Sequence, residues 1–336
     1  MELAVDVEKR SESHFEEGIQ RIHKLVAEVE KVIVGQRPSI CRIVVALLAD
    51  GHVLLEGVPG LAKTLLVSAL GSAMGAVFQR IQMVPDMLPS DLIGTYLLVG
   101  NRFKLQKGPL VDCHVALVDE INRAPAKTQA ALLQAMQERQ VTVMGKDTLE
   151  LPDPFIVLAT QNPIEQDGTY PLPEAQLDRF LFKVLVGYPS PEHELDILTN
   201  VNLDQRDKIK AVNQVLEPQD ICHLRETIKR EVSVEHYAHE YIVDLVRATR
   251  FPGEFGLKSL DGCLKLGASP RATMALRDAA RVEAFLHGRR YVYPEDVQTV
   301  AKDVFRHRIC LEFSAEAEGL NVETVMQEIL DGVHIP

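Results

Sequence analysis

The strongest constraint on the fold is the stretch from Val53 to Thr64, Val-Leu-Leu-Glu-Gly-Val-Pro-Gly-Leu-Ala-Lys-Thr. Its first residues are apolar and predict a short buried strand, a glycine-rich turn follows, and Lys63-Thr64 begins an apolar helical run to Met74. A strand, a tight loop and a helix N-terminus in this order bring unpaired backbone N–H groups and the positive end of a helix to one place. The stretch therefore predicts a binding site for phosphate.

The spacing of Gly57, Ala62, Lys63 and Thr64 follows the phosphate-loop pattern, with alanine in place of its last glycine. A methyl group is tolerated where that residue has helical dihedral angles. We expect Lys63 to contact the β- and γ-phosphates and the Thr64 hydroxyl to ligate Mg²⁺. Taken alone, the stretch is also compatible with an ordinary strand-to-helix turn. The residues predicted to surround the phosphates are Gly57, Val58, Pro59, Gly60, Leu61, Ala62, Lys63, Thr64 and Leu65.

Length and composition favour a globular chain of two domains. The 336 residues exceed one average domain, and 46% hydrophobic with 25% charged residues is an ordinary globular composition. No apolar run approaches the length of a membrane span, and the acidic N-terminus is unlike a secretory signal peptide. The five cysteines are scattered, odd in number and without a C-x-x-C pair. We therefore expect a cytoplasmic protein without an integral membrane segment.

The net charge of −12 argues against a surface made to bind nucleic acid, because phosphate binding needs clustered lysines and arginines. A local basic groove stays compatible with this charge. The basic pairs Arg289-Arg290 and Arg306/Arg308 are more typical of solvated helix ends than of a nucleic-acid footprint. Nucleic acid is therefore the less favoured partner.

Short apolar segments alternate with helical patterns through the first half of the chain. Strands that are nearly all apolar and alternate with helices imply an α/β fold with a parallel sheet covered on both faces. Two hairpins are expected in addition, within 96–105 and 141–151. The expected strands are 53–55, 76–81, 115–118, 155–159 and 181–186, and the expected helices are 14–33, capped at Ser13, 38–49, 65–74 and 125–138.

Three candidate site segments follow three of these strands. They are the phosphate loop after the first strand, Asp119-Glu120 after the strand 115–118, and Asn162 after the strand 155–159. In open parallel sheets, ligands bind beyond the carboxyl ends of the strands. We therefore expect these segments to meet at one edge of the sheet.

Asp119 and Glu120 supply two adjacent carboxylates, which hydrolysis of a bound nucleotide needs. Asp119 is expected to hold Mg²⁺, usually through water, and Glu120 to polarise the attacking water as a general base. Asn162 is a candidate to orient the same water. Adjacent carboxylates at a strand end can also be a solvated turn, and an asparagine before proline can simply form a turn.

Beyond about residue 190 the helical pattern dominates. Ser269, Pro270 and Gly288 form a helix start and stop, and Pro294 opens another helix to about Phe305. The C-terminal part is therefore expected to be a smaller, all-helical domain.

Two arginines are candidates to contact the nucleotide. Arg179 lies directly before the strand 181–186, and an arginine supplied by a neighbouring subunit can stabilise charge on the γ-phosphate. Arg271 lies in the first turn of a helix, where the helix dipole does not favour a cation. That placement indicates an anionic partner, and the bound nucleotide is one candidate.

With these motifs, the chain resembles the MoxR-type AAA+ ATPases over nearly its whole length. Residues 57–64 are similar to the family's phosphate loop, alanine included. The segments Val-Asp-Glu-Ile-Asn-Arg-Ala-Pro (118–125) and Ala-Thr-Gln-Asn-Pro (159–163) resemble its Walker B and sensor 1 regions. Further similar segments are Leu-Pro-Glu-Ala-Gln-Leu-Asp-Arg-Phe (172–180) to the arginine-finger region, Gly-Ala-Ser-Pro-Arg-Ala (267–272) to sensor 2, and Tyr-Pro-Glu-Asp-Val (293–297) to the later lid.

The resemblance implies an AAA+ αβα P-loop core with a parallel sheet over 1–190, followed by a linker and an all-helical lid domain over 191–336. It implies ATP and Mg²⁺ as cofactors and a homo-oligomeric ring, commonly a hexamer, with active sites between subunits. It assigns 92–108 as an insert in the second core helix and 139–151 as the hairpin before sensor 1. By the same resemblance, Val34, Gly35 and Gln36 border the adenine, and Arg123 can reach the subunit interface.

One departure from the family is the segment 252–266, which is longer than usual before sensor 2. An idle loop is the favoured interpretation, and a lid embellishment that touches a partner is the alternative.

Three functions stay open from the sequence. The favoured one is an ATP-driven ring that remodels, matures or assembles protein clients in a chaperone-like way, with a von Willebrand factor A domain protein as a partner that the resemblance suggests. The second is an AAA+ nucleic-acid motor, which the net charge disfavours although Lys146 in the second hairpin leaves it possible. The third is a nucleotide-dependent assembly switch with little turnover.

Overall fold

The computed structural model describes residues 2–58, 63–162, 169–199 and 205–336, and its chain divides into two compact units. One unit, here called the core, comprises Arg21–Arg179 and Val184–His223. The other, here called the lid unit, comprises Met1–Gln20, Phe180–Lys183 and Leu224–Pro336. None of the described helices combines the length and the apolar character needed to cross a membrane.

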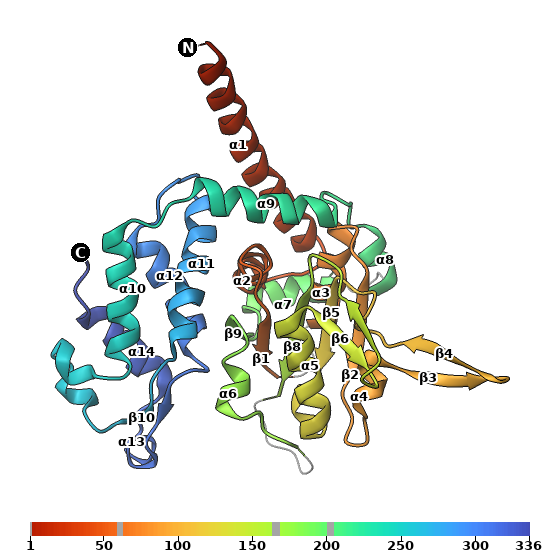
Figure 1. Ribbon diagram of the computed structural model, residues 1–336. Helices are drawn as coiled ribbons and strands as arrows, with labels where there is room; N and C mark the ends of the chain where they lie inside the picture. Colours follow the sequence, from red (N-terminus) through yellow and green to blue (C-terminus); the bar gives the residue numbers. More distant parts are fainter. Residues whose placement is uncertain (1, 59–62, 163–168, 200–204) are drawn as a thin grey trace. The chain divides into compact units, whose positions relative to one another are not determined.

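The core is built on a five-stranded sheet of order β2-β5-β8-β1-β9 (Figure 1). The pairs β2–β5, β5–β8 and β1–β8 are parallel, which confirms the predicted parallel sheet. β5 and β8 are almost entirely buried because neighbouring strands and covering helices enclose them. The strands are β1 (Val53–Glu56), β2 (Phe78–Gln82), β5 (Val115–Asp119), β8 (Ile156–Gln161) and β9 (Phe182–Leu185).

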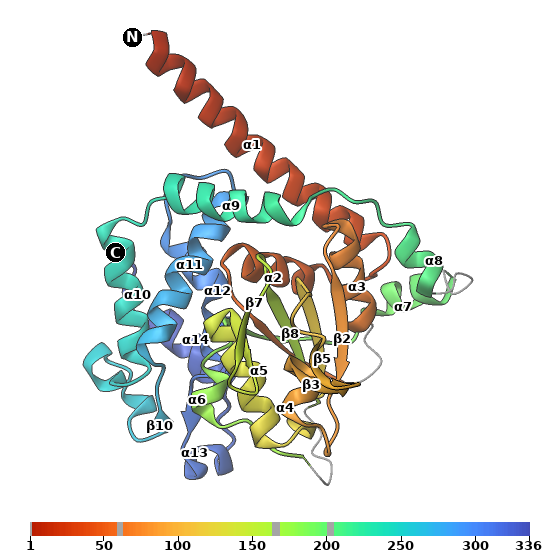
Figure 2. The same ribbon diagram turned by 45° about the vertical axis from the view of Figure 1, so that its right-hand side comes forward.

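Helices cover both faces of this sheet. The connection β1–α3–β2 crosses the sheet in one direction and β5–α5–β8 crosses in the other (Figures 1 and 2). Since such crossovers are right-handed, α3 and α5 must lie on opposite faces. Leucine and alanine side chains of both helices are buried. Three helices of the core are α2 (Arg37–Leu48), α3 (Lys63–Ala73) and α5 (Ala126–Glu138).

Two hairpins interrupt the core. The first, β3 (Gly94–Val99) with β4 (Arg102–Lys107), follows the short helix α4 (Pro89–Ile93) and extends away from the sheet in Figure 1. The second pairs β6 (Gln140–Val143) with β7 (Asp147–Glu150). The first hairpin contacts the second, where Lys146 Nζ lies 5.7 and 5.8 Å from the ring centroids of Tyr96 and Phe103. Both hairpins lie in the segments where the sequence predicts them.

The first helix is longer than predicted. α1 runs from Glu2 to Glu30, so Ser13 lies inside it and is not an N-cap. Residues 2–12 contain neither glycine nor proline, and several are strong helix formers, so nothing in that segment stops the helix. The remaining core elements are η1 (Ile121–Arg123), α6 (Glu174–Leu177), α7 (Pro191–Thr199) and α8 (Gln205–Lys210).

The lid unit is mainly helical, and its two predicted helix starts are confirmed. Ser269 caps α11 by accepting a hydrogen bond from the Arg271 N–H at 3.1 Å, and Gly288 follows the helix with φ of 72°. The helices of this region are α10 (His236–Ala248), α11 (Pro270–Leu286), α12 (Pro294–Phe305), α13 (Phe313–Ala317) and α14 (Val322–Gly332), preceded by α9 (Pro218–Glu231).

The segment 252–266 is not the idle loop that the sequence favoured. It forms η2 (Pro252–Phe255), η3 (Lys258–Leu260) and β10 (Leu264–Leu266), and β10 pairs with β11 (Cys310–Leu311). Leu257 and Leu260 are buried, so the segment has an apolar anchor. The lid unit therefore contains a small two-stranded sheet, which a prediction of helices alone does not include.

Candidate functional site

The carboxyl ends of β1, β5 and β8 bring the predicted site segments together. Val118 of β5 is paired with Ala159 of β8, and Glu56 of β1 with Gln161 of the same strand. The residues that follow these strands are therefore neighbours at one edge of the sheet (Figure 1). The predicted co-location is confirmed for the described residues Gly57, Glu120 and Asn162. Pro59, Gly60, Leu61 and Ala62 lie outside the described residues.

Lys63 lies at the start of α3 with its ammonium group directed back to the end of β1. Its Nζ donates a hydrogen bond to the Gly57 carbonyl at 2.5 Å. Burial lowers the pKa of Lys63, while the nearby carboxylates of Asp119, Glu56 and Glu120 act to raise it. One half-buried cation and three carboxylates therefore lie close together at this edge of the sheet, where they are partly shielded from water. Thr64 and Leu65 follow in the first turn of the same helix.

Gly57 lies where a side chain does not fit. A Cβ atom at this position would lie 2.5 Å from the Val186 carbonyl oxygen. The backbone after β1 therefore passes close to the chain after β9, and only glycine is accommodated without a shift.

Asp119 ends β5 and is buried, with 8% of its surface exposed. Its Oδ2 accepts a hydrogen bond from Arg80 Nε at 2.7 Å, and its Oδ1 accepts one from the Thr160 hydroxyl at 3.2 Å. Two partners on neighbouring strands thus fix the carboxylate.

Glu120 has left-handed backbone dihedral angles, φ 56° and ψ 53°. Its N–H donates to Thr160 Oγ1 at 2.9 Å, so one hydroxyl connects both acidic residues. Its carboxylate accepts from Gln82 Nε2 at 3.0 Å and forms an ion pair with Arg123 at 3.0 Å. A non-glycine residue in this conformation is strained, and such strain is typical of functional sites.

The sequence interpretation missed three residues of this cluster, namely Arg80, Gln82 and Thr160. Arg80 and Gln82 belong to β2, an edge strand whose residues are largely exposed. The available signal was the polar residue Thr160 directly before Gln161-Asn162 in an otherwise apolar strand.

Arg179 follows α6 and turns toward α5. Its Nη1 donates to the Leu133 carbonyl at 2.9 Å, whereas its buried Nε has no hydrogen-bond partner among the described residues. Gln129 of the same helix binds the carbonyls of Ile121 and Tyr170 at 3.2 and 2.9 Å. The side chain of Arg179 is therefore anchored to α5 through only part of its guanidinium group.

The loop Val34-Gly35-Gln36 is held against the first turn of α7 (Pro191–Thr199) and the segment before it. Gly35 has φ of 76°, and a Cβ there would lie 2.9 Å from the His193 ring. Gln36 is buried and donates from Nε2 to the Gly187 carbonyl at 3.0 Å. This loop lies in the core, whereas Arg271 is an exposed residue of the lid unit.

The described residues fit a nucleotide with a divalent cation. Carboxylate and hydroxyl oxygens, as Asp119 and Thr64 supply, are the ligands that Mg²⁺ takes from proteins, with phosphates and water completing the shell. The close backbone at Gly57 and the half-buried ammonium of Lys63 suit an anion that needs to be held at short range.

Comparison with known proteins agrees with this geometry. The family model described as "ATPase family associated with various cellular activities (AAA)" matches residues 52–182, and the AAA lid domain model matches 259–329. The chain is 45% identical over 320 residues to the chaperone MoxR1 of Mycobacterium tuberculosis, covering 95% of this chain and 83% of that protein. It is 34% identical over 297 residues to the protein MoxR of Methylorubrum extorquens, covering 85% and 86%.

A solved structure from Cytophaga hutchinsonii, described as a candidate ATPase, is similar over almost the full chain. It superposes with a TM-score of 0.90 at 44% identity and covers 98% of both chains. The sheet order, the site at its carboxyl edge and these matches lead to one assignment: the chain belongs to the MoxR-type AAA+ ATPases.

Proposed function

We propose that this protein is a Mg²⁺-dependent ATP hydrolase that works as a homo-oligomeric ring, most simply a hexamer, and remodels, matures or assembles protein clients. The observation that carries the proposal is the cluster at the carboxyl edge of the sheet, where the carboxylates of Asp119 and Glu120 act on the half-buried Lys63. Family membership supplies the use of nucleotide and the relation to chaperones.

In this proposal, each residue of the edge has one task. Lys63 and the backbone of residues 57–65 bind the phosphates, and Val34, Gly35 and Gln36 border the adenine. Thr64 and Asp119 hold the Mg²⁺, which when bound neutralises charge on the phosphate oxygens. Glu120 accepts the proton of the attacking water, and Asn162 orients that water.

Three arginines are assigned to stabilise charge on the phosphates and to join subunits. Arg179 is assigned to the nucleotide of the neighbouring subunit, Arg271 to the nucleotide from the lid, and Arg123 to the subunit interface. The hydrogen bond from Arg179 Nη1 to the Leu133 carbonyl supports the first assignment, because it holds the guanidinium in a fixed position against α5.

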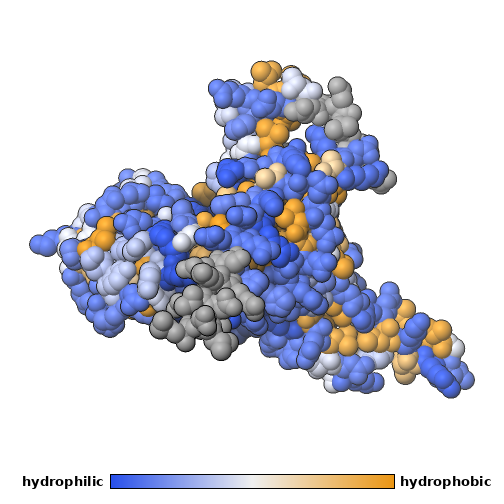
Figure 3. Space-filling view, turned by 90° about the horizontal axis from the view of Figure 1, so that it is seen from above, coloured by the Kyte–Doolittle hydropathy of each residue, from blue (hydrophilic) through white to orange (hydrophobic). Residues whose placement is uncertain are grey.

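The surface of the β3–β4 hairpin supports contact with protein clients. Leu98, Val99 and Phe103 are exposed to 65, 60 and 70%. In Figure 3 the hairpin is the arm at the lower right, where hydrophobic residues alternate with hydrophilic ones. Exposed apolar side chains gathered on one arm are typical of protein interaction sites. A von Willebrand factor A domain partner and a cytoplasmic location remain part of this proposal.

The client assignment has a direct test. Leu98→Ser combined with Phe103→Ser should weaken binding of a reduced, carboxymethylated model protein about 30-fold, because two large apolar contacts, each worth on the order of 1 kcal/mol, are lost. Basal ATP hydrolysis should stay unchanged. The matched control is Thr142→Ser, at an exposed position on the second hairpin. Unchanged binding by the double variant would assign client contact to another surface.

Steady-state phosphate release tests the enzymatic proposal. Glu120→Gln should retain ATP binding and lower kcat by roughly 100-fold or more, the contribution usual for a general base. Glu138→Gln, at an exposed glutamate of α5, is the matched control and should keep wild-type kcat. Negligible turnover by the wild-type chain would favour the assembly switch, whereas salt-dependent retention on DNA at physiological ionic strength would favour a nucleic-acid motor.

A further inference from the structure

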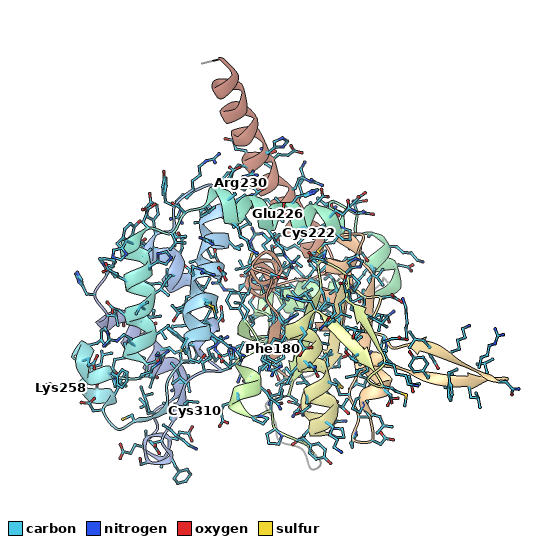
Figure 4. The ribbon with its side chains drawn as sticks, viewed as in Figure 1. Phe180, Cys222, Glu226, Arg230, Lys258 and Cys310 are labelled. Atoms are coloured by element: carbon cyan, nitrogen blue, oxygen red, sulfur yellow. The ribbon has the colours of Figure 1, made fainter. Side chains whose placement is uncertain are left out.

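The C-terminal end of α12 binds the main chain that follows Arg179. Arg308 donates from Nη2 to the Phe180 carbonyl at 2.6 Å and from Nη1 to the Leu181 carbonyl at 3.1 Å. His307 Nε2 lies 3.0 Å from the same Phe180 oxygen, and Arg306 Nη1 donates to the Lys183 carbonyl at 2.5 Å. We call Arg306, His307 and Arg308 the lid clamp. Phe180 is labelled in Figure 4.

His307 and Arg308 are buried and only 11% of the Arg306 side chain is exposed, which corrects the expectation that Arg306 and Arg308 lie at a solvated helix end. Only 5% of the surface of His307 and of Arg308 is exposed, and Phe180 is fully buried. Burial, with the neighbouring cation Arg308, lowers the pKa of His307 well below its usual value. The imidazole is therefore neutral, and because its Nε2 faces a carbonyl oxygen it must donate there.

Other residues of the lid unit hold the clamp in place. Arg306 binds Asp303 at 2.5 Å and also pairs with Glu323. Arg308 additionally donates to the Val304 carbonyl at 2.5 Å, one turn earlier in α12. Burying arginine side chains is costly, and stability alone is served as well by apolar residues. Donors aimed at successive carbonyls instead fix the path of a main-chain segment.

That segment connects two parts of the candidate site. Phe180–Lys183 belongs to the lid unit, whereas Arg179 before it and Val184 after it belong to the core. On one side, Arg179 binds the Leu133 carbonyl of α5. On the other side, the Val186 N–H donates to the Glu56 carbonyl at 2.8 Å, directly before Gly57. The clamped residues are thus covalently joined to the arginine-finger candidate and, through β9, lead to the phosphate loop.

We propose that the lid clamp positions Arg179, so that the lid unit sets the rate of hydrolysis through the segment Phe180–Lys183. The clamp residues are positioning residues, since they bind the main chain next to Arg179 and act through it. The inference depends on the proposed role of Arg179 toward the nucleotide. A displacement of about 1 Å at a group that stabilises the transition state can cost on the order of 100-fold in rate.

Arg308→Lys is the first test, because one ammonium group cannot reach the three carbonyls that the guanidinium binds. It should lower kcat for ATP hydrolysis at least about tenfold and leave the Kd for ATP within about twofold. The matched control is Arg289→Lys, which alters an arginine of the same unit bound to the buried carboxylate of Asp296. That control should lower Tm and keep kcat.

His307 supplies a second pair of variants that keeps the test valid if Arg308→Lys does not fold. His307→Gln retains a donor toward the Phe180 carbonyl and should keep kcat near the wild-type value. His307→Met removes the donor at similar volume and should lower kcat several-fold. Equal kcat in the two variants would contradict the proposal.

The double variant Arg179→Ala/Arg308→Lys separates this inference from the proposed function. If the clamp acts through Arg179, the double variant should have the kcat of Arg179→Ala alone. Multiplied losses in kcat would overturn the inference. A lowered kcat in Arg179→Ala with wild-type kcat in Arg308→Lys would refute the clamp alone, whereas an unchanged kcat in Arg179→Ala would refute the role of Arg179 and the inference with it.

Discussion

The carboxyl edge of the sheet and the lid clamp both hold cations away from water, and they do so in opposite ways. At the edge, Lys63 lies near the carboxylates of Asp119, Glu56 and Glu120, next to a backbone that leaves no room for a Cβ at Gly57. In the clamp, the donors of Arg308 and His307 are directed at main-chain carbonyls of a buried segment.

The difference indicates two different tasks. Concentrated charge of both signs, with a lysine held by one carbonyl, suits the anion and counter-ion that we propose bind there. Donors bound to successive carbonyls are arranged to hold the chain itself. Residues at the edge should therefore control nucleotide binding and turnover, and clamp residues should control stability and the position of what they hold.

Among residues that are not themselves assigned to contact the nucleotide or the Mg²⁺, we expect the largest effect on kcat at Thr160. Thr160→Val keeps the shape and removes the hydroxyl that bonds both Asp119 and the Glu120 N–H. We expect kcat for ATP hydrolysis to fall about tenfold, because the carboxylate of Glu120 loses its fixed position. Thr160→Ser retains the hydroxyl and is the control. A wild-type kcat in Thr160→Val would show that the edge does not depend on this link.

The sequence predicted the edge better than the clamp. Apolar strands followed by Gly57, Asp119 and Asn162 have a strong local signal, because strand ends in a parallel sheet share one edge. The sequence interpretation treated Arg306 and Arg308 as solvated, since an arginine at a helix end usually is. Only tertiary packing, which brings the chain from Phe180 to Lys183 against the end of α12, reveals that both arginines bind main-chain carbonyls.

The same limit explains the other differences. The helix α1 extends to Glu2 because no breaker precedes the expected cap at Ser13. The order in 252–266 depends on pairing of β10 with β11, residues separated by more than forty positions. Long-range pairs of this kind leave little trace in local sequence.

A smaller effect is expected from the pH dependence of the clamp. The pKa of His307 is lower in the folded chain than its unfolded value of about 6.5, so the unfolded chain binds the proton first as the pH falls. The contribution of His307 to stability is present above about pH 6.5 and is lost at about 1.4 kcal/mol per pH unit below it.

Thermal unfolding between pH 7.5 and 5.0 measures this effect. Tm of the wild-type chain should fall more steeply below pH 6.5 than Tm of His307→Gln. His239→Gln, at an exposed histidine of the same unit, should retain the wild-type slope. Parallel curves for the wild type and His307→Gln would contradict a neutral, buried imidazole in the clamp.

The affinity of Lys63→Ala for ATP tests the central claim most directly. Loss of a half-buried cation that pairs with phosphate should cost about 2–5 kcal/mol, which weakens Kd by about 30-fold to several thousand-fold. Isothermal titration in the presence of Mg²⁺ gives this value, with Lys127→Ala, at an exposed lysine of α5, as the control that keeps wild-type affinity. A wild-type Kd in Lys63→Ala would show that the nucleotide does not bind at the carboxyl edge of this sheet.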